Sequence, residues 1–267
     1  MRTGIFFTLT ACFVLLLSFL LMSCGSNRES SSSSTLPVPQ SFYYVALGDS
    51  LGAGIMATQG YVPRYAEFIR QDSGRSLTLV NLSHSGWRSR DLLNALRNDQ
   101  NFRTQLQKAN VVTFDIGGND LLAARSQYLS GQCGGTDNLE CFRNGVEQFK
   151  ANWDAIVAEI LRLKSPKDTI IRTMDLYNPF IQMHLQRGDL ELLNPFLDEV
   201  NSHIESSANA NGILMAPVHR ALNGPTGTED PAAEGLISAD ALHPNDAGHE
   251  VIAEQLQKLG YAPFQVR

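Results

Sequence analysis

Four short stretches of the sequence hold side chains that could together perform nucleophilic chemistry. Ser50 follows an apolar run in "VALGDSL", and Asn119 follows another in "DIGGND". Asp240 and His243 stand three residues apart in "DALHPND", and Gly86 lies in the polar stretch "SHSGWRS". A serine becomes nucleophilic when a histidine removes its proton, and a carboxylate can orient that histidine. An asparagine amide and a glycine N–H can stabilise an oxyanion. These residue types favour acyl transfer.

Each stretch also has a purely structural interpretation when it is taken alone. Ser50 could be a turn or helix-capping serine, and "GGND" could be a simple loop. Asp120 is expected to cap the helix that follows it. His84 and Trp87 are expected to pack or to form a pocket wall, and His249 to lie on the surface of a helix.

Five apolar runs are expected to form β-strands. Most are continuous rather than alternating, which is typical of a parallel sheet that is covered on both faces. The runs span residues 42–47, 77–82, 110–117, 169–176 and 212–219. The four candidate stretches each follow one of these strands or precede a helix. Because ligands bind at the carboxyl ends of strands in such sheets, we expect the four stretches to meet there.

Helices are expected between the strands. The clearest has apolar residues at spacings of three and four from Val146 to Leu161, which indicates one buried stripe. The others cover about 61–72, 89–98, 189–208 and 246–259. The alternation of strands and helices predicts an α/β protein, a three-layer α/β/α sandwich with a mostly parallel sheet. No repeat or linker divides it, so we expect one domain over 41–267.

The N-terminal residues have the composition of an export signal. Residues 1–23 combine a basic start with a long apolar run, and residues 21–24, "LMSC", resemble a bacterial lipobox. We therefore expect a lipoprotein signal peptide over 1–23, lipidation of Cys24 and a Ser/Pro-rich tether over 24–40. This predicts an extracytoplasmic protein of the cell envelope, held to a membrane by its lipid. A plain signal peptide or a transmembrane anchor is the alternative.

The remaining cysteines and the charge limit the other classes of site. Cys133 and Cys141 form an even pair that is expected to close a small disulfide loop in an oxidising compartment. Zinc binding by this pair, or metal binding by Asp240, His243 and His249, would lack further ligands. The formal net charge is -6 and no Lys/Arg-rich run occurs, which argues against a nucleic-acid partner. No feature specifies an oligomeric state.

Taken together and in this order, "GDSL", "GGND" and "DALH" resemble the motifs of the SGNH hydrolase superfamily, the GDSL esterases and lipases. The resemblance extends from Tyr43 to about Leu259. It implies a flavodoxin-like sandwich whose five strands have the order 2-1-3-4-5, and it implies no metal or organic cofactor. The Gly-x-Ser-x-Gly elbow of ordinary α/β-hydrolases is absent around the serine.

The resemblance also implies a role for each candidate residue. Ser50 would be the nucleophile, and its own N–H would be one donor of the oxyanion hole. The Gly86 N–H and the Asn119 side chain would be the other donors. His243 would be the base, oriented by Asp240. Because an imidazole must be neutral to act as a base, this predicts activity that falls below a pH of about 6–7.

The resemblance also implies a carboxylic ester as the substrate, either an acyl or short-chain lipid-like ester or a lysophospholipid. Loops 177–196 and 220–238 are expected to decide among these. Within the first loop, apolar side chains could bind an acyl group or could simply pack beneath the loop. They are Phe180, Met183, Leu185 and Phe196. The alternatives are a polysaccharide O-acetylesterase, an inactive surface-tethered binding protein on the same fold, and a flavodoxin-like cofactor binder.

Overall fold

The computed structural model of the protein describes residues 36–266. The expected signal peptide (1–23), Cys24 and most of the expected tether (24–40) lie outside these residues. Within them, residues 36–40 already contact the folded chain. Leu36 pairs with Phe264 near the C-terminus, and Val38 packs against the apolar core.

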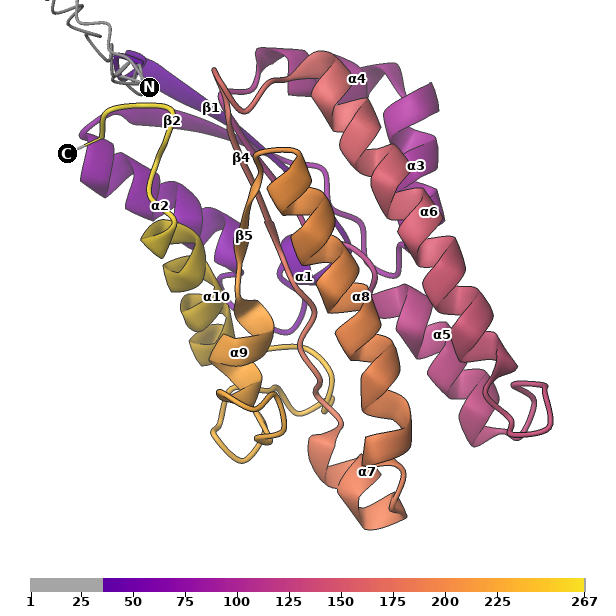
Figure 1. The fold of residues 1–267 in the computed structure, drawn as a ribbon. Coiled ribbons are helices and arrows are strands. Elements are labelled where there is room, and N and C mark those ends of the chain that lie inside the picture. The colour runs from indigo at the N-terminus through magenta and orange to yellow at the C-terminus, as the bar shows by residue number, and fades with distance from the viewer. Residues whose placement is uncertain (1–35, 267) are drawn as a thin grey trace, which may run out of the picture. The chain divides into compact units, whose positions relative to one another are not determined.

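A five-stranded parallel sheet in the order β2-β1-β3-β4-β5 forms the middle layer of the described residues (Figure 1). The strands are β1 (Ser41–Leu47), β2 (Ser76–Asn81), β3 (Val111–Phe114), β4 (Ile170–Met174) and β5 (Leu214–Ala216). The order and the fold class are confirmed. Strands β3 and β5 end earlier than predicted, because Asp115 and Val218 already belong to the segments that leave the sheet.

Helices cover both faces of the sheet. They are α1 (Ser50–Ala53), α2 (Tyr61–Ser73), α3 (Ser89–Asn98), α4 (Gln100–Lys108), α5 (Gly118–Leu129), α6 (Glu140–Leu163), α7 (Ile181–Arg187), α8 (Leu190–Ala210), α9 (Val218–Asn223) and α10 (Asp246–Lys258). The expected long helices are all present. The helix expected after Asp120 is α5, and α1, α4, α7 and α9 were not predicted. In residues 36–266, every helix is too short or too polar to span a lipid bilayer.

The core consists of two apolar layers, one on each face of the sheet. Val45 and Leu47 of β1 point into the layer formed with α3, α4, α6 and α8. Tyr44 and Ala46 point into the opposite layer, with α2, α9 and α10. The predicted stripe of α6 is buried in the first layer, including the fully buried Trp153. The strands are packed between the two layers, so their carboxyl ends lie together at one edge of the sheet.

Candidate active site

The chain turns sharply at the end of β1 and places Ser50 at the start of α1. A side chain at Gly48 would collide with Asp115, since its Cβ would lie 1.7 Å from a carboxylate oxygen. The carboxylate of Asp49 accepts a hydrogen bond from the Leu51 N–H at 2.9 Å and so caps α1. Ser50 is 8% exposed. Its hydroxyl is therefore held in one place beside a cavity.

His243 brings its ring to this hydroxyl from the segment before α10. The distance between His243 Nε2 and Ser50 Oγ is 2.8 Å, and His243 Nδ1 lies 2.6 Å from a carboxylate oxygen of Asp240. Because the carboxylate accepts, Nδ1 carries the ring proton and Nε2 is free to accept from the serine hydroxyl. The structure thus joins three of the sequence-predicted residues in one hydrogen-bonded chain.

The carboxylate of Asp240 is held by several donors. One oxygen accepts from the Ser238 hydroxyl at 2.6 Å and from the backbone N–H groups of Leu242 and His243 at 3.0 Å. Burial alone would raise the pKa of Asp240. The hydrogen bonds from His243, Ser238 and the backbone outweigh burial and lower this pKa well below its usual value. Asp240 therefore stays ionised and orients the imidazole.

Asn119 lies at the start of α5 and lines the same cavity as Ser50. Its amide donates to the Trp87 carbonyl at 2.9 Å and lies 3.3 Å from the Asp49 carboxylate. Gly86 sits one residue before Trp87 in an exposed turn with φ +81, a value that favours glycine. Asn119 thus links the Gly86 loop to Asp49, the residue before the serine, although Gly86 itself does not line the cavity.

Two buried carboxyl groups beneath the serine were not singled out in the sequence. Burial raises the pKa of Asp49 to about 6. Burial, and then the nearby charge of Asp49, also raises the pKa of Asp115. One oxygen of Asp115 accepts from the Tyr61 hydroxyl at 3.1 Å, and the other has no partner among the described residues. The feature of the sequence that could have identified Asp115 is an aspartate at the end of a continuous apolar run.

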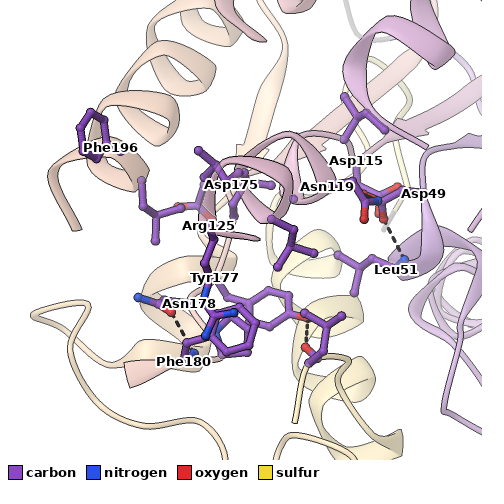
Figure 2. A pocket seen from close by; sticks show the side chains of 18 of the residues that line it. Asp49, Leu51, Asp115, Asn119, Arg125, Asp175, Tyr177, Asn178, Phe180 and Phe196 are labelled. Carbon is purple, nitrogen blue, oxygen red and sulfur yellow. Dashed lines mark hydrogen bonds between the residues drawn. The ribbon is translucent and has the colours of Figure 1, made fainter. Parts of the chain in front are cut away.

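The cavity beside Ser50 has a volume of about 130 Å³ and extends from the strand ends between α5 and α8 (Figure 2). Ser50, Asn119 and His243 line one part of it. Most of the rest of the wall is apolar and includes Ile116, Leu121, Leu122, Phe142, Leu176, Phe180, Leu193, Phe196 and Leu197. Of the four loop residues considered for acyl binding, Phe180 and Phe196 line the cavity. Met183 and Leu185 are 41% and 55% exposed and do not.

The sequence of the chain matches the model of the GDSL-like Lipase/Acylhydrolase family over residues 46–251. The chain belongs to this family. The match includes every residue of the hydrogen-bonded chain from Ser50 to Asp240, and it also includes Asn119. The resemblance drawn from the motifs is confirmed. Because the family consists of lipases and acylhydrolases, its members are ester hydrolases, and this protein is one of them.

Proteins similar to this chain include lipases and an esterase. A spore germination lipase of Bacillus licheniformis, LipC, is 27% identical over 227 residues, which cover 83% of this chain and 98% of the relative. The lipase Lip_vut3 from a goat rumen metagenome is 26% identical with a TM-score of 0.70, over 85% of this chain and 100% of that one. An acetylxylan esterase from Geobacillus stearothermophilus shares the fold, with 20% identity and a TM-score of 0.61 over 87% and 100% of the two chains.

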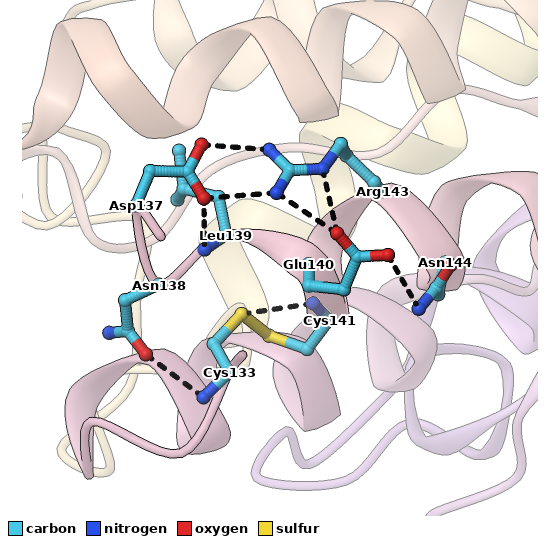
Figure 3. A network of polar contacts seen from close by, with 8 residues as sticks. All are labelled: Cys133, Asp137, Asn138, Leu139, Glu140, Cys141, Arg143 and Asn144. Atoms are coloured by element: carbon cyan, nitrogen blue, oxygen red, sulfur yellow. Dashed lines mark hydrogen bonds and ion pairs between the residues drawn. A yellow bond between two sulfur atoms is a disulfide. The ribbon is translucent and has the colours of Figure 1, made fainter. Parts of the chain in front are cut away.

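Cys133 and Cys141 form the expected disulfide in the connection between α5 and α6 (Figure 3). The Cys141 N–H donates to the Cys133 carbonyl at 2.8 Å, and Asn138 holds the Cys133 N–H at 3.0 Å. Phe142, the next residue after the bridge, lines the cavity. The disulfide therefore fixes one wall of the cavity at the end remote from the sheet.

Three other expectations have different outcomes. His84 stacks on Trp87 at 4.1 Å beside a separate polar groove, in agreement with a packing role. His249 is not on the surface: it is 1% exposed, accepts from the Tyr61 N–H at 3.1 Å, and burial lowers its pKa to about 4. Asp120 does not cap its own helix, because its carboxylate binds the N–H and hydroxyl of Ser89 at the start of α3.

The structure also bears on metal binding at the site. Among residues 36–266, no three His, Cys, Asp or Glu side chains are grouped so that they could hold a metal ion. His249 points to Tyr61 rather than toward His243 and Asp240, so the three residues considered as ligands do not converge.

Proposed function

We propose that the protein is a serine-dependent carboxylic ester hydrolase in which Ser50 is the nucleophile, His243 the general base and Asp240 its orienting partner. The observation that carries this proposal is the 2.8 Å contact between Ser50 Oγ and His243 Nε2 at the edge of an apolar cavity. A serine and a histidine at hydrogen-bond distance, with the histidine held by a carboxylate, are the arrangement that acyl transfer requires.

The proposed reaction has two steps. His243 takes the proton as Ser50 attacks the ester carbonyl, and the alcohol then leaves with that proton. Water repeats the path and releases the acid. The oxyanion would be held by the Ser50 N–H at the start of α1, by the Asn119 amide, and by the Gly86 N–H from the loop that Asn119 contacts. No step requires a cofactor.

The proposed substrate is an acyl or lipid-like ester rather than a sugar acetate. A cavity walled by leucine and phenylalanine side chains matches an acyl chain, because burial of each methylene group contributes about 0.8 kcal/mol. An acetyl group would leave most of this apolar wall without a partner. Lysophospholipids fall within the same class.

Hydrolysis of p-nitrophenyl esters of increasing chain length, by the protein and by Ser50→Ala, tests the proposal. We expect turnover that rises beyond acetate, and a loss of about three decades or more in kcat for Ser50→Ala. Organophosphonate labelling that depends on Ser50 would separate a narrow substrate range from an inactive protein. Equal rates for the two proteins would refute the role of Ser50.

We further propose that Cys24 is lipidated and that the enzyme works outside the cytoplasm, attached to a membrane through a tether. The disulfide between Cys133 and Cys141 supports an oxidising compartment. Incorporation of labelled fatty acid into the full chain, and its absence from Cys24→Ser, is the expected result. Labelling that persists in Cys24→Ser would contradict this assignment.

A further inference from the structure

One cation lines the cavity without an acidic partner. Arg125 lies on α5, on the wall that also contains Leu121 and Leu122. Among the described residues, no carboxylate lies within ion-pair distance of its guanidinium, whereas the neighbouring Arg187 is paired with Asp189. Burial lowers the pKa of Arg125. The positive charge of a partly buried guanidinium without a carboxylate partner is unfavourable unless an anion binds to it.

Neutral groups hold the Arg125 side chain in place. Its Nε–H donates to His184 Nε2 at 3.2 Å, and one terminal nitrogen lies 2.6 Å from the Met183 sulfur. The guanidinium carbon lies 3.8 Å from the centre of the Phe180 ring. Figure 2 shows the side chain directed toward Phe180 and Asn178 within the cavity. The arginine is therefore fixed by contacts with neutral groups rather than by an ion pair.

A second histidine–aspartate pair fixes the histidine that receives this hydrogen bond. His184 Nδ1 lies 2.6 Å from Asp189, whose other carboxylate oxygen accepts from Arg187 Nε at 2.9 Å. Because Arg125 can only donate, Nε2 of His184 accepts and the ring is neutral. The cluster then holds two guanidinium groups and one carboxylate. Its net charge of about +1 favours an anion beside Arg125.

The guanidinium also has the donors that an anion needs. It carries five N–H groups, and two of them are used by His184 and Met183. The other three have no hydrogen-bond partner in residues 36–266. A planar guanidinium with free N–H groups binds carboxylate and phosphate through paired hydrogen bonds.

The helix sets the distance between this cation and the reacting carbonyl. Asn119, Leu122 and Arg125 follow one another at intervals of three along α5 and all line the cavity. Six residues of helix at about 1.5 Å each separate Asn119 from Arg125 by about 9 Å along the axis. The guanidinium lies against Phe180, Met183 and His184 on the neighbouring wall.

We propose that Arg125 forms an anion-binding subsite, so that the preferred ester carries a carboxylate or a phosphate about two helical turns from the carbonyl that Ser50 attacks. This inference rests on the proposed function. The shared chemistry is an anionic oxygen group on an otherwise apolar ester. Its two sources are the free carboxylate of a dicarboxylic acid monoester and the phosphate of a lysophospholipid.

Two matched substrate pairs test the subsite. One pair is p-nitrophenyl hexanoate and the mono-p-nitrophenyl ester of adipic acid, and the other is a monoacylglycerol and the lysophosphatidate with the same acyl chain. The measured quantity is the ratio of kcat/KM for the anionic member to that for the neutral member. The variants are Arg125→Met and Arg125→Lys. Arg90→Met, on the exposed surface of α3, is the control.

We expect the ratio for at least one pair to fall about tenfold or more in Arg125→Met and to fall less in Arg125→Lys, while Arg90→Met leaves it unchanged. The pair that responds identifies the source of the anion. If Arg125 only supports the cavity wall, Arg125→Met lowers both members of each pair together and the ratio stays the same. An unchanged ratio in both pairs, or anionic esters that the unmodified protein does not hydrolyse, overturns the subsite.

The failures of the two proposals are distinguishable. Absence of neutral-ester hydrolysis together with absence of phosphonate labelling refutes the serine mechanism itself. Ser50-dependent hydrolysis of neutral esters without a charge-dependent ratio refutes the subsite alone. If Arg125→Met does not fold, Arg125→Gln provides a second neutral variant, and the same tenfold fall in the ratio is required of it.

Discussion

The histidines of two histidine–aspartate pairs line the same cavity, and the two pairs share one geometry. In both His243–Asp240 and His184–Asp189, the Nδ1 atom lies 2.6 Å from a carboxylate oxygen. In both, burial would raise the pKa of the aspartate, but hydrogen bonds from the histidine and its neighbours lower it. The contact between ring and carboxylate therefore does not distinguish them.

The groups that face the other ring nitrogen do distinguish the two pairs. Nε2 of His243 faces the hydroxyl of Ser50, which can give up a proton, whereas Nε2 of His184 faces the guanidinium of Arg125, which keeps its protons. The first pair is also more accessible than the second, since the His243 side chain is 16% exposed and that of His184 only 4%. One pair is suited to proton transfer and the other to holding a cation.

Replacement of each histidine by glutamine should produce the largest contrast. His243→Gln removes the base, so we expect kcat to fall by about 10³ or more with little change in stability. His184→Gln removes a buried hydrogen-bonded ring, so we expect about 1–3 kcal/mol less stability and a fall in neutral-ester kcat of less than about tenfold. Ester hydrolysis and urea unfolding measure both. Equal losses of kcat in the two variants would contradict the distinction.

The aspartates should show the same contrast at a smaller scale. Asp240→Asn leaves the imidazole in the wrong tautomer, and we expect a fall in kcat of about 10² or more. Asp189→Asn should instead lower the unfolding free energy by about 1–2 kcal/mol at neutral pH.

The pH dependence of the stability of Asp189→Asn shows whether the Asp189 carboxylate stabilises the folded protein. The pKa of Asp189 is lowered in the folded protein, so the stability it contributes is complete above its unfolded pKa of about 3.9 and is lost as the pH falls through the folded value. The stability difference between the unmodified protein and Asp189→Asn should thus shrink below about pH 4. A difference that grew on acidification would show that the carboxylate is not stabilised by its partners.

Much of the first pair could be predicted from the sequence, because its members are close in the chain. Asp240 and His243 are three residues apart, and Ser50 and Asn119 follow apolar strands whose order is that of the family. The parallel sheet then brings their carboxyl ends together. Local spacing predicted the Asp240–His243 pair, and the family resemblance, which implied the strand order, predicted that Ser50 and Asn119 meet it.

The second pair could not be predicted in this way. Arg125 lies on α5, where Leu121 and Leu122 face the cavity and only Ala124 is buried in the core, so this helix has no apolar stripe to reveal it. His184 ends up buried because α8 folds back against α7, a tertiary contact without a local signal. His249 was misjudged for the same reason, since Tyr61 covers it from another part of the chain.

The buried carboxyl groups beneath the serine extend the comparison to aspartates without a histidine or arginine partner. Burial, and then the nearby charge of Asp49, raises the pKa of Asp115, so its ionisation above the unfolded pKa of about 3.9 lowers the stability of the folded protein as the pH rises. Asp115→Asn removes this ionisation and can still accept from Tyr61. We expect its stability relative to the unmodified protein to increase by about 1–2 kcal/mol between pH 4 and pH 8, as thermal or urea unfolding would measure.

Asp49→Asn provides the matched control, because its relative stability should also increase with pH, but over a narrower pH range. The pKa of Asp49 is raised to about 6, so the relative gain from this replacement should develop between about pH 4 and pH 6 and stay constant above that range. For Asp115→Asn, a relative stability that fell with rising pH would show that Asp115 behaves like Asp189 and has a stabilising partner. The sign of the change in relative stability with pH, rather than its size, separates a carboxylate that a cation stabilises from one whose charge is disfavoured by burial.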